Sequence, residues 1–287
     1  MTRQDVTVHR FDDDLANAFT QADALLAAEI ADLHRRLDRT IIIGLCGPQG
    51  SGKSSTAARL VARLGLLGLT AVSRSLDDFY LTKSERRILC KEVHPLLETR
   101  GVPGTHDLKL LRDTLRQLAS VAQTDELALP TFDKTRDDRA PVEDWPVFCG
   151  RADIIILEGW CVGARPQPPE CLHRPINMLE EQEDPDAVWR AFVNEQLADD
   201  YAALFADLDL SILLKAPSFD CIFGWRAEQE AKLTRPEDGS RPAMTEGELR
   251  RFIAHYERVT RWLMEDEPAD LVVEIGADRK PLNWFRR

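Results

Sequence analysis

The chain has 287 residues, of which 44% are hydrophobic and 30% charged, as expected of a globular protein with one large α/β domain or two small ones. Its formal net charge of -12 would repel a phosphate backbone, so we expect no nucleic-acid partner. No stretch approaches about 18 apolar residues, and no apolar leader follows Met1, so we expect no membrane span. The six cysteines form no C-x-x-C pair and are expected to be reduced, which favours a cytoplasmic location.

The N-terminal segment has the pattern of a packing helix over residues 12–38. Asp12, Asp13 and Asp14 can cap its start. Apolar side chains then recur at helical spacing: Leu15, Phe19, Leu26, Ile30, Leu33 and Leu37. We therefore interpret residues 1–39 as an N-terminal helical extension and residues 40–287 as the main domain.

From residue 41 onward, short apolar runs alternate with helical patterns. Residues 41–46 (Ile-Ile-Ile-Gly-Leu-Cys) are continuously apolar, as in a strand buried on both faces. Further strands are predicted at 70–75, 154–157, 210–214 and, closing the sheet, 271–275. Helices are predicted through residues 60–67 and over 108–121, 187–205, 219–233 and 245–264, the last with Thr245 and Glu248 as a capping box. Loops are expected at 81–104 (with one short helix), 163–177 and 235–242. This alternation predicts an α/β fold, with a mostly parallel sheet covered by helices on both faces.

Residues 47–54 (Gly-Pro-Gln-Gly-Ser-Gly-Lys-Ser) match the phosphate-binding motif G-x-x-x-x-G-K-[ST] in full, between a strand and a helix. In such a loop the backbone N–H groups surround phosphate oxygens, and the positive end of the following helix points at the same phosphates. Lys53 is expected to reach the β- and γ-phosphates and Ser54 to ligate Mg²⁺. The motif predicts ATP and Mg²⁺ as cofactors. The expected nucleotide-binding residues are Gly47, Pro48, Gln49, Gly50, Ser51, Gly52, Lys53, Ser54, Ser55 and, from a later helix, Arg226.

Two acidic segments follow predicted strands, at the edge of the sheet where ligands bind in α/β proteins. Asp77 lies in Ser75-Leu76-Asp77-Asp78-Phe79-Tyr80 and could accept or orient the proton of an attacking hydroxyl. The alternative is that the aspartate pair is only turn chemistry. Glu158 ends the run 154–157 and could contact Mg²⁺, or it could be an ordinary surface carboxylate. Lys53, Asp77 and Glu158 are the predicted catalytic residues.

Basic residues are frequent in three loop segments, at 100–107, 130–134 and 136–139. They could hold an anionic substrate, although a solvated charged loop is the default interpretation. The helix that begins near Trp225 carries Arg226 and could belong to a mobile lid over the phosphates, near residues 226–245. The alternative is a solvated helix with ion pairs along its length.

In this order, the motifs resemble those of the plant- and fungal-type D-glycerate 3-kinases. The resemblance spans roughly residues 40–275 and rests on the P-loop and on five further segments: Asp77–Tyr80, Arg100–Asp107, Phe132–Lys134, Glu158–Pro166 and Trp225–Glu230. That family belongs to the wider group of phosphoribulokinases, uridine kinases and bacterial pantothenate kinases. The resemblance implies a three-layer P-loop kinase in which Asp77 is the base and a neighbour of Mg²⁺. The candidate metal residues are Ser54, Asp77 and Glu158. The acidic stretch 174–186 and the acidic loop tip 236–239 depart from the pattern.

We therefore expect transfer of the ATP γ-phosphoryl group to a hydroxyl of a small acid, with D-glycerate the best candidate and 3-phosphoglycerate the product. The candidate substrate-binding residues are Asp77, Tyr80, Arg100, His106, Lys134, Arg139 and Arg165. Kinases with other acceptors share the same chemistry, so a nucleoside, a pantothenate-like acid or a phosphosugar stays an alternative. So does an NTP-hydrolysing switch or chaperone, although the chain lacks the N-K-x-D motif that reads guanine. A monomer or a homodimer is expected.

Overall fold

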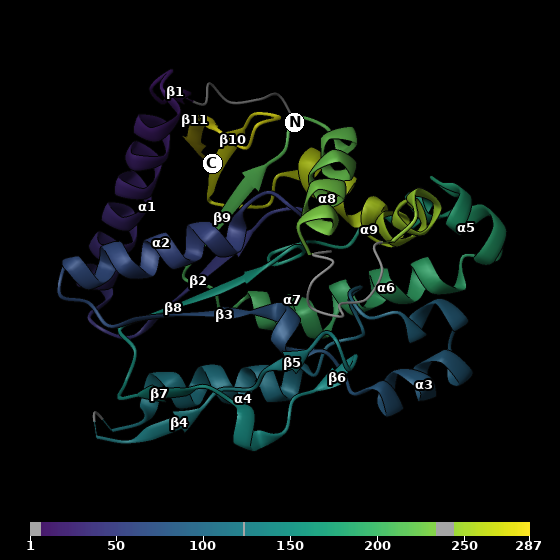
Figure 1. Cartoon of the computed structure of the whole chain (residues 1–287), viewed down its shortest axis with the longest axis horizontal. Coiled ribbons are helices and arrows are strands. Elements are labelled where there is room, and N and C mark those ends of the chain that lie inside the picture. The colour runs from purple at the N-terminus through teal and green to yellow at the C-terminus, as the bar shows by residue number, and fades with distance from the viewer. Residues whose placement is uncertain (1–6, 123, 234–243) are drawn as a thin grey trace.

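A seven-stranded sheet forms the centre of the computed structural model, which describes residues 7–122, 124–233 and 244–287 (Figure 1). The strand order is β1-β11-β10-β9-β2-β8-β3, and the pairs from β10 to β3 are parallel. The strands are β1 (His9–Arg10), β2 (Ile41–Cys46), β3 (Ala71–Ser75), β8 (Ile154–Gly159), β9 (Leu210–Lys215), β10 (Leu271–Ile275) and β11 (Pro281–Arg286). The mostly parallel α/β fold predicted from the sequence is confirmed.

The apolar strands separate two hydrophobic cores, because successive side chains of a strand point to opposite faces. Ile41, Ile43 and Leu45 of β2 belong to one core, and Ile155 and Leu157 of β8 belong to the other. All five are fully buried. Both faces therefore need a covering layer, which explains why these strands read as continuous apolar runs rather than as alternating ones.

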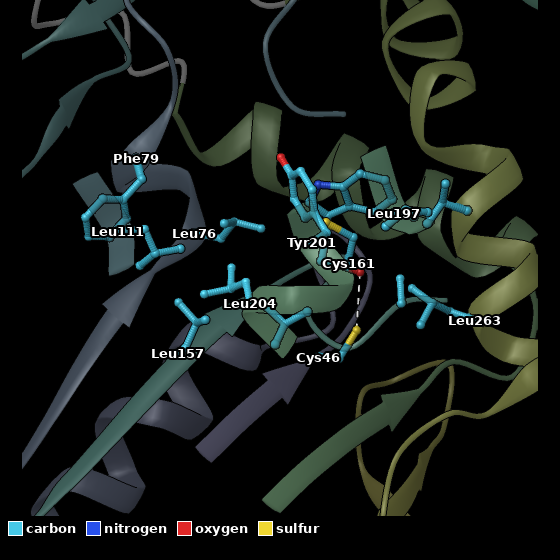
Figure 2. Packing of buried hydrophobic residues seen from close by; sticks show 14 of the residues in the cluster. Cys46, Leu76, Phe79, Leu111, Leu157, Cys161, Leu197, Tyr201, Leu204 and Leu263 are labelled. Carbon is cyan, nitrogen blue, oxygen red and sulfur yellow. Dashed lines mark hydrogen bonds between the residues drawn. The ribbon is translucent and has the colours of Figure 1, made fainter. Parts of the chain in front are cut away.

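Helices supply both layers. The helices are α1 (Leu15–Leu37), α2 (Lys53–Leu66), α3 (Lys83–Glu92), α4 (Leu108–Ser120), α5 (Met178–Glu183), α6 (Val188–Ala198), α7 (Asp200–Phe205), α8 (Phe219–Leu233) and α9 (Glu246–Asp266). Helices α1, α2 and α8 contribute to the first core. Helices α4, α6, α7 and α9 contribute to the second, part of which is shown in Figure 2. Among the described residues, no helix has the length and apolarity needed to cross a bilayer.

Several local predictions need correction. The strand at 271–275 does not close the sheet, because β11 pairs with it antiparallel and β1 pairs with β11. The helix expected over 187–205 is two helices, since Asp199 leaves the helical conformation. The segment 81–104 is more regular than expected, with α3 and a 3₁₀ turn at Pro95–Glu98. The capping box of Thr245 and Glu248 is present as predicted.

Two small antiparallel ribbons lie outside the main sheet: β4 (Glu126–Ala128) with β7 (Val147–Cys149), and β5 (Phe132–Asp133) with β6 (Asp138–Arg139). Phe132 anchors the second ribbon and is buried. The turn between β5 and β6 begins with Lys134, whose side chain reaches back toward the carboxyl end of β3. The ribbon thus brings a basic residue to the edge of the sheet where the P-loop lies.

Candidate active site

The P-loop connects β2 to α2, and two of its glycines adopt a left-handed backbone conformation. Gly50 has φ +77° and Gly52 has φ +87°, values that are costly for residues with a Cβ. Gly52 is the N-cap of α2 and offers no side-chain acceptor to the first N–H groups of that helix. Those N–H groups, together with the positive end of the helix dipole, are available to a phosphate.

Two elements from the far end of the chain hold the loop in shape. A Cβ added to Gly50 would lie 2.6 Å from the Cβ of Trp225, so α8 packs directly against the loop. Arg279, in the turn between β10 and β11, donates from Nε to the carbonyl of Gly50 at 2.6 Å. Trp225 in turn donates from its indole to the carbonyl of Ala277 at 2.6 Å. Sequence reasoning gave neither Trp225 nor Arg279 this supporting role, since the contacts join segments far apart in the chain.

A candidate Mg²⁺ site is formed where β8 ends beside the P-loop. Ser54 donates its hydroxyl to Oε1 of Glu158 at 2.8 Å. Glu158 is buried, and its Oε2 has no hydrogen-bond partner. A buried carboxylate oxygen without a partner is costly unless a cation uses it, so these two oxygen donors fit a hard cation such as Mg²⁺. No group of three or more His, Cys, Asp or Glu side chains suited to a metal occurs in the described part of the chain.

Asp77 and Asp78 lie in a 3₁₀ turn (Leu76–Phe79) directly after β3, and the structure gives them different partners. Asp78 forms an ion pair with Arg74 at 3.1 Å, back along β3. Burial raises the pKa of Asp78, and the Arg74 charge opposes that effect. Asp77 instead accepts hydrogen bonds from Tyr80 and Lys134, both at 2.6 Å. The two neighbours therefore have different surroundings, and Asp77 is the one that contacts the other candidate site residues Tyr80 and Lys134.

The pKa of Asp77 reflects its position between two lysines. Burial raises this pKa, but the charges of Lys134 and Lys53 outweigh burial. The hydrogen bonds from Lys134 and Tyr80 add to their effect, and together these contacts hold the pKa well below its ordinary value. Lys53 belongs to the P-loop and Lys134 to the β5–β6 turn. Asp77 therefore feels the charges of both the phosphate-binding loop and the basic ribbon.

Tyr80 and His106 form the buried floor beside Asp77. Their rings stack with centroids 4.8 Å apart, and Tyr80 also meets the edge of Phe132. His106 Nδ1 is hydrogen-bonded to the hydroxyl of Tyr201 at 2.5 Å, while its Nε2 is buried with no partner. Burial lowers the pKa of His106 to about 4, so the ring is neutral near pH 7. Tyr201, on α7, was not among the predicted site residues.

Arg100 lies beside this floor, and Tyr256 holds its backbone. Its guanidinium lies 5.9 Å from the Tyr80 ring centroid and forms an ion pair with Asp137. Tyr256, on α9, donates to the carbonyl of Arg100 at 3.2 Å. Gly101 has no room for a side chain, since a Cβ there would lie 2.1 Å from the Tyr256 hydroxyl. The conformation at Arg100 thus depends on α9.

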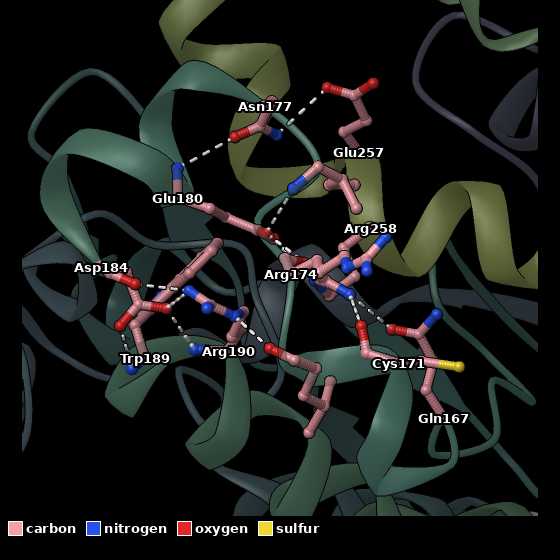
Figure 3. A network of polar contacts seen from close by, with 12 residues as sticks. Gln167, Cys171, Arg174, Asn177, Glu180, Asp184, Trp189, Arg190, Glu257 and Arg258 are labelled. Atoms are coloured by element: carbon pink, nitrogen blue, oxygen red, sulfur yellow. Dashed lines mark hydrogen bonds and ion pairs between the residues drawn. The ribbon is translucent and has the colours of Figure 1, made fainter. Parts of the chain in front are cut away.

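A buried polar network holds α9 in place (Figure 3). Arg258 forms an ion pair with Glu180 of α5 at 2.6 Å and also donates to the carbonyls of Cys171 and Arg174. Arg190 pairs with Asp184 in the same region. Part of the segment 163–177, expected to be a loop, therefore packs tightly against α9 and helps to position Tyr256.

The other predicted arginines are each occupied by an acidic neighbour. Arg139 pairs with Asp107 at 2.9 Å, and Arg226 pairs with Glu230 one turn along α8. Arg165 is largely exposed and lies 3.9 Å from Asp266 at the end of α9. The contacts of Arg139, Arg226 and Arg165 give no direct link to Asp77 or Lys53. Half of the predicted lid, residues 234–243 with the loop 235–242, lies outside the described residues.

The sheet order, the conformation of the P-loop and the Ser54–Glu158 pair beside it define a P-loop nucleotide-binding protein. Comparison with known proteins specifies the group. The model of the phosphoribulokinase/uridine kinase family matches residues 42–163. The chain is 33% identical over 227 residues to an uncharacterized kinase of Schizosaccharomyces pombe, mug58, covering 76% of this chain and 79% of that protein. This chain belongs to the phosphoribulokinase/uridine kinase family.

Two further relatives are D-glycerate 3-kinases. The chloroplastic enzyme of Arabidopsis thaliana is 29% identical over 223 residues, which cover 75% of this chain but only 46% of that protein. The solved structure of the enzyme from Cryptococcus neoformans has a TM-score of 0.75 at 23% identity, covering 93% of this chain and 99% of that one. The structural likeness shows a shared fold, and the sequence likeness agrees with the resemblance seen in the motifs.

Proposed function

We propose that this P-loop kinase transfers the γ-phosphoryl group of ATP to a hydroxyl of a small acid, with D-glycerate as acceptor and 3-phosphoglycerate as product. The position of Asp77 carries the proposal. The charge of P-loop Lys53 acts on its carboxylate, which is also bonded to Lys134. An acceptor hydroxyl beside Asp77 would therefore lie close to the γ-phosphate that Lys53 contacts.

We assign each residue a role in this reaction. The loop 47–54, with Ser55 after it, would bind the phosphates of ATP, and Ser54 and Glu158 would hold Mg²⁺, which neutralises phosphate charge when bound. Lys53 would stabilise negative charge that develops on the γ-phosphoryl group. Asp77 would accept the hydroxyl proton. The octahedral shell of Mg²⁺ has room for more than Ser54 and Glu158, so we propose Asp77 both as the base and as a neighbour of the metal.

An acidic acceptor is favoured by the charges around Asp77. Arg100 lies over the rings of Tyr80 and Phe132, and Lys134 is bonded to Asp77, which Tyr80 also contacts. Cationic side chains of this kind recognise carboxylates through charge-assisted hydrogen bonds. The names of the two D-glycerate 3-kinases point to the same substrate class.

The free state of all six cysteines supports our proposal of a cytoplasmic location.

The test is an acceptor screen with purified protein, ATP and Mg²⁺. ADP release would be measured with D-glycerate, other small hydroxy acids, nucleosides, pantothenate and phosphosugars, and the phosphorylated product would be identified by mass spectrometry. We expect the highest kcat/KM with D-glycerate. Turnover that is fastest with a nucleoside or a sugar would replace the acceptor but leave the kinase class intact. ADP release that is equally fast without any acceptor would favour an NTP hydrolase.

A further inference from the structure

Both carboxylate oxygens of Asp77 are already engaged. Tyr80 donates its hydroxyl to Oδ1 and Lys134 donates Nζ to Oδ2, each at 2.6 Å. Each oxygen keeps a second lone pair for an incoming hydroxyl, but the ammonium group of Lys134 on Oδ2 lowers the pKa of Asp77 and makes it a weak base. Asp77 becomes a better proton acceptor when this contact opens.

Tyr80 is the fixed partner. It is only 3% exposed, lies between the His106 and Phe132 rings, and its backbone forms a bridge with His106. Its hydroxyl cannot leave Asp77 without disturbing this packed floor.

Lys134 is the movable partner. Its side chain is 57% exposed and extends from the turn between β5 and β6. That turn is held by other contacts, since Asp133 accepts from the backbone N–H groups of Thr135 and Arg136, and Asp137 pairs with Arg86. The ammonium group can therefore swing away while the backbone of the ribbon stays in place.

The neighbouring arginines have acidic partners outside the reaction centre. Arg100 pairs with Asp137, and Arg139 pairs with Asp107. The ionic partner of Lys134, by contrast, is the proposed base itself. A second carboxylate that enters beside Asp77 would compete for Lys134, and the half-exposed ion pair is weak enough to be exchanged.

We propose that transfer requires a carboxylate on the acceptor because of Lys134. The carboxylate of an acidic substrate pairs with Lys134, which then leaves Asp77, so that Asp77 is free to act as the base. This inference rests on the proposed function and extends it to substrate selection. Once Oδ2 is free, the acceptor hydroxyl oxygen bonds to the γ-phosphorus and the bond to the β,γ-bridging oxygen breaks. That electron pair leaves with ADP. The hydroxyl proton passes to Asp77 and from there to solvent. A neutral acceptor of the same size would leave Lys134 on Asp77.

The experiment compares D-glycerate with glycerol, in which a CH₂OH group replaces the carboxylate. For the full-length wild type and the variants Lys134→Met and Lys134→Arg, kcat and KM would be measured for each acceptor and for ATP. Loss of a hydrogen bond between charged groups predicts that Lys134→Met lowers the preference for glycerate over glycerol by about 10- to 100-fold. Lys134→Arg should restore part of the preference, and the KM for ATP should change little.

Lys109→Met is the matched control, because Lys109 is also an exposed lysine paired with an aspartate, Asp113, at 2.7 Å. It should leave the preference unchanged. If Lys134→Met slows both acceptors by the same factor, Lys134 only positions Asp77 and the inference is wrong. A wild type that uses glycerol as well as glycerate would also overturn it. A wild type that phosphorylates no small acid would overturn the proposed function itself.

Discussion

Ser54 and Glu158 are joined by a 2.8 Å hydrogen bond, although they lie 104 residues apart in the chain. The contact arises because β2 and β8 are parallel neighbours in register, with Leu45 opposite Glu158. The carboxyl ends of adjacent parallel strands meet at one edge of a sheet, so the P-loop helix starts beside the end of β8. The unpartnered Oε2 of Glu158 at this point is the strongest structural argument for a metal.

We expect Glu158→Gln to raise the Mg²⁺ concentration needed for half-maximal activity by about 10- to 100-fold. The amide keeps the size of the side chain and an oxygen that Ser54 can bond, but it removes the negative charge. Activity should be titrated with Mg²⁺ at fixed ATP, and excess chelator should abolish it in the wild type. An unchanged Mg²⁺ requirement in a folded variant would exclude the metal role of Glu158.

Lys53→Ala should lower turnover by about 100-fold or more and leave the melting temperature nearly unchanged. The reason is that Lys53 is assigned to charge developing on the phosphoryl group rather than to packing. Turnover and thermal unfolding would be measured on the same preparation. Near-normal turnover in a folded Lys53→Ala would remove the central claim for the P-loop.

Asp77→Asn should reduce kcat by about 100-fold or more with little change in the KM for ATP, because proton acceptance matters only as the hydroxyl attacks. Asp78→Asn is the internal control. Its partner is Arg74, so its cost should appear in thermal stability rather than in kcat. If Asp78→Asn is the slow variant and Asp77→Asn is not, the assignment within the pair is reversed.

Arg258→Met should lower the free energy of unfolding by about 3–5 kcal/mol, because Glu180 would then be a fully buried carboxylate without its ionic partner. Arg251→Met is a matched control, since Arg251 and Glu183 join the same helices, α9 and α5, through an exposed pair. Its cost should be about 1 kcal/mol or less. Urea unfolding measures both. The double variant Arg258→Met/Glu180→Leu should recover part of the loss, and equal costs for the two single variants would contradict this account.

The protein should lose stability as the pH falls from about 6.5 to about 4. Burial lowers the pKa of both His106 and His255 to about 4 in the folded chain, against an ordinary value of 6.5. In this pH window the unfolded chain therefore binds more protons than the folded one, which favours unfolding. Each histidine contributes at most about 1.4 kcal/mol per pH unit. His255→Leu should reduce the slope of the unfolding free energy against pH by the contribution of one histidine, which is at most about 1.4 kcal/mol per pH unit. An unaltered slope would show that His255 is not responsible.

Features of the fold could be predicted from the sequence where residues close together in the chain determine them. Continuous apolar runs such as 41–46 must be buried on both faces, which already implies a parallel sheet between helical layers. Gly50 and Gly52 of the P-loop are needed at positive φ, and the lysine and serine that follow begin the helix. The strand-end position of Glu158 followed from the same pattern. The capping box at Thr245 was equally local, because its partner is three residues away.

The partners of charged side chains depended on the tertiary structure. Arg100, Arg139 and Arg165 looked equivalent as candidates to bind an acid, but the fold pairs Arg100 with Asp137 and Arg139 with Asp107, and places Arg165 near Asp266. These partners come from distant segments whose approach no local pattern encodes. Strand β11 was missed for a related reason: its residues alternate irregularly between buried and exposed, and only pairing with β10 makes it a strand. The contact of Lys134 with Asp77, which carries the further inference, exists because a separate ribbon folds back over the end of β3.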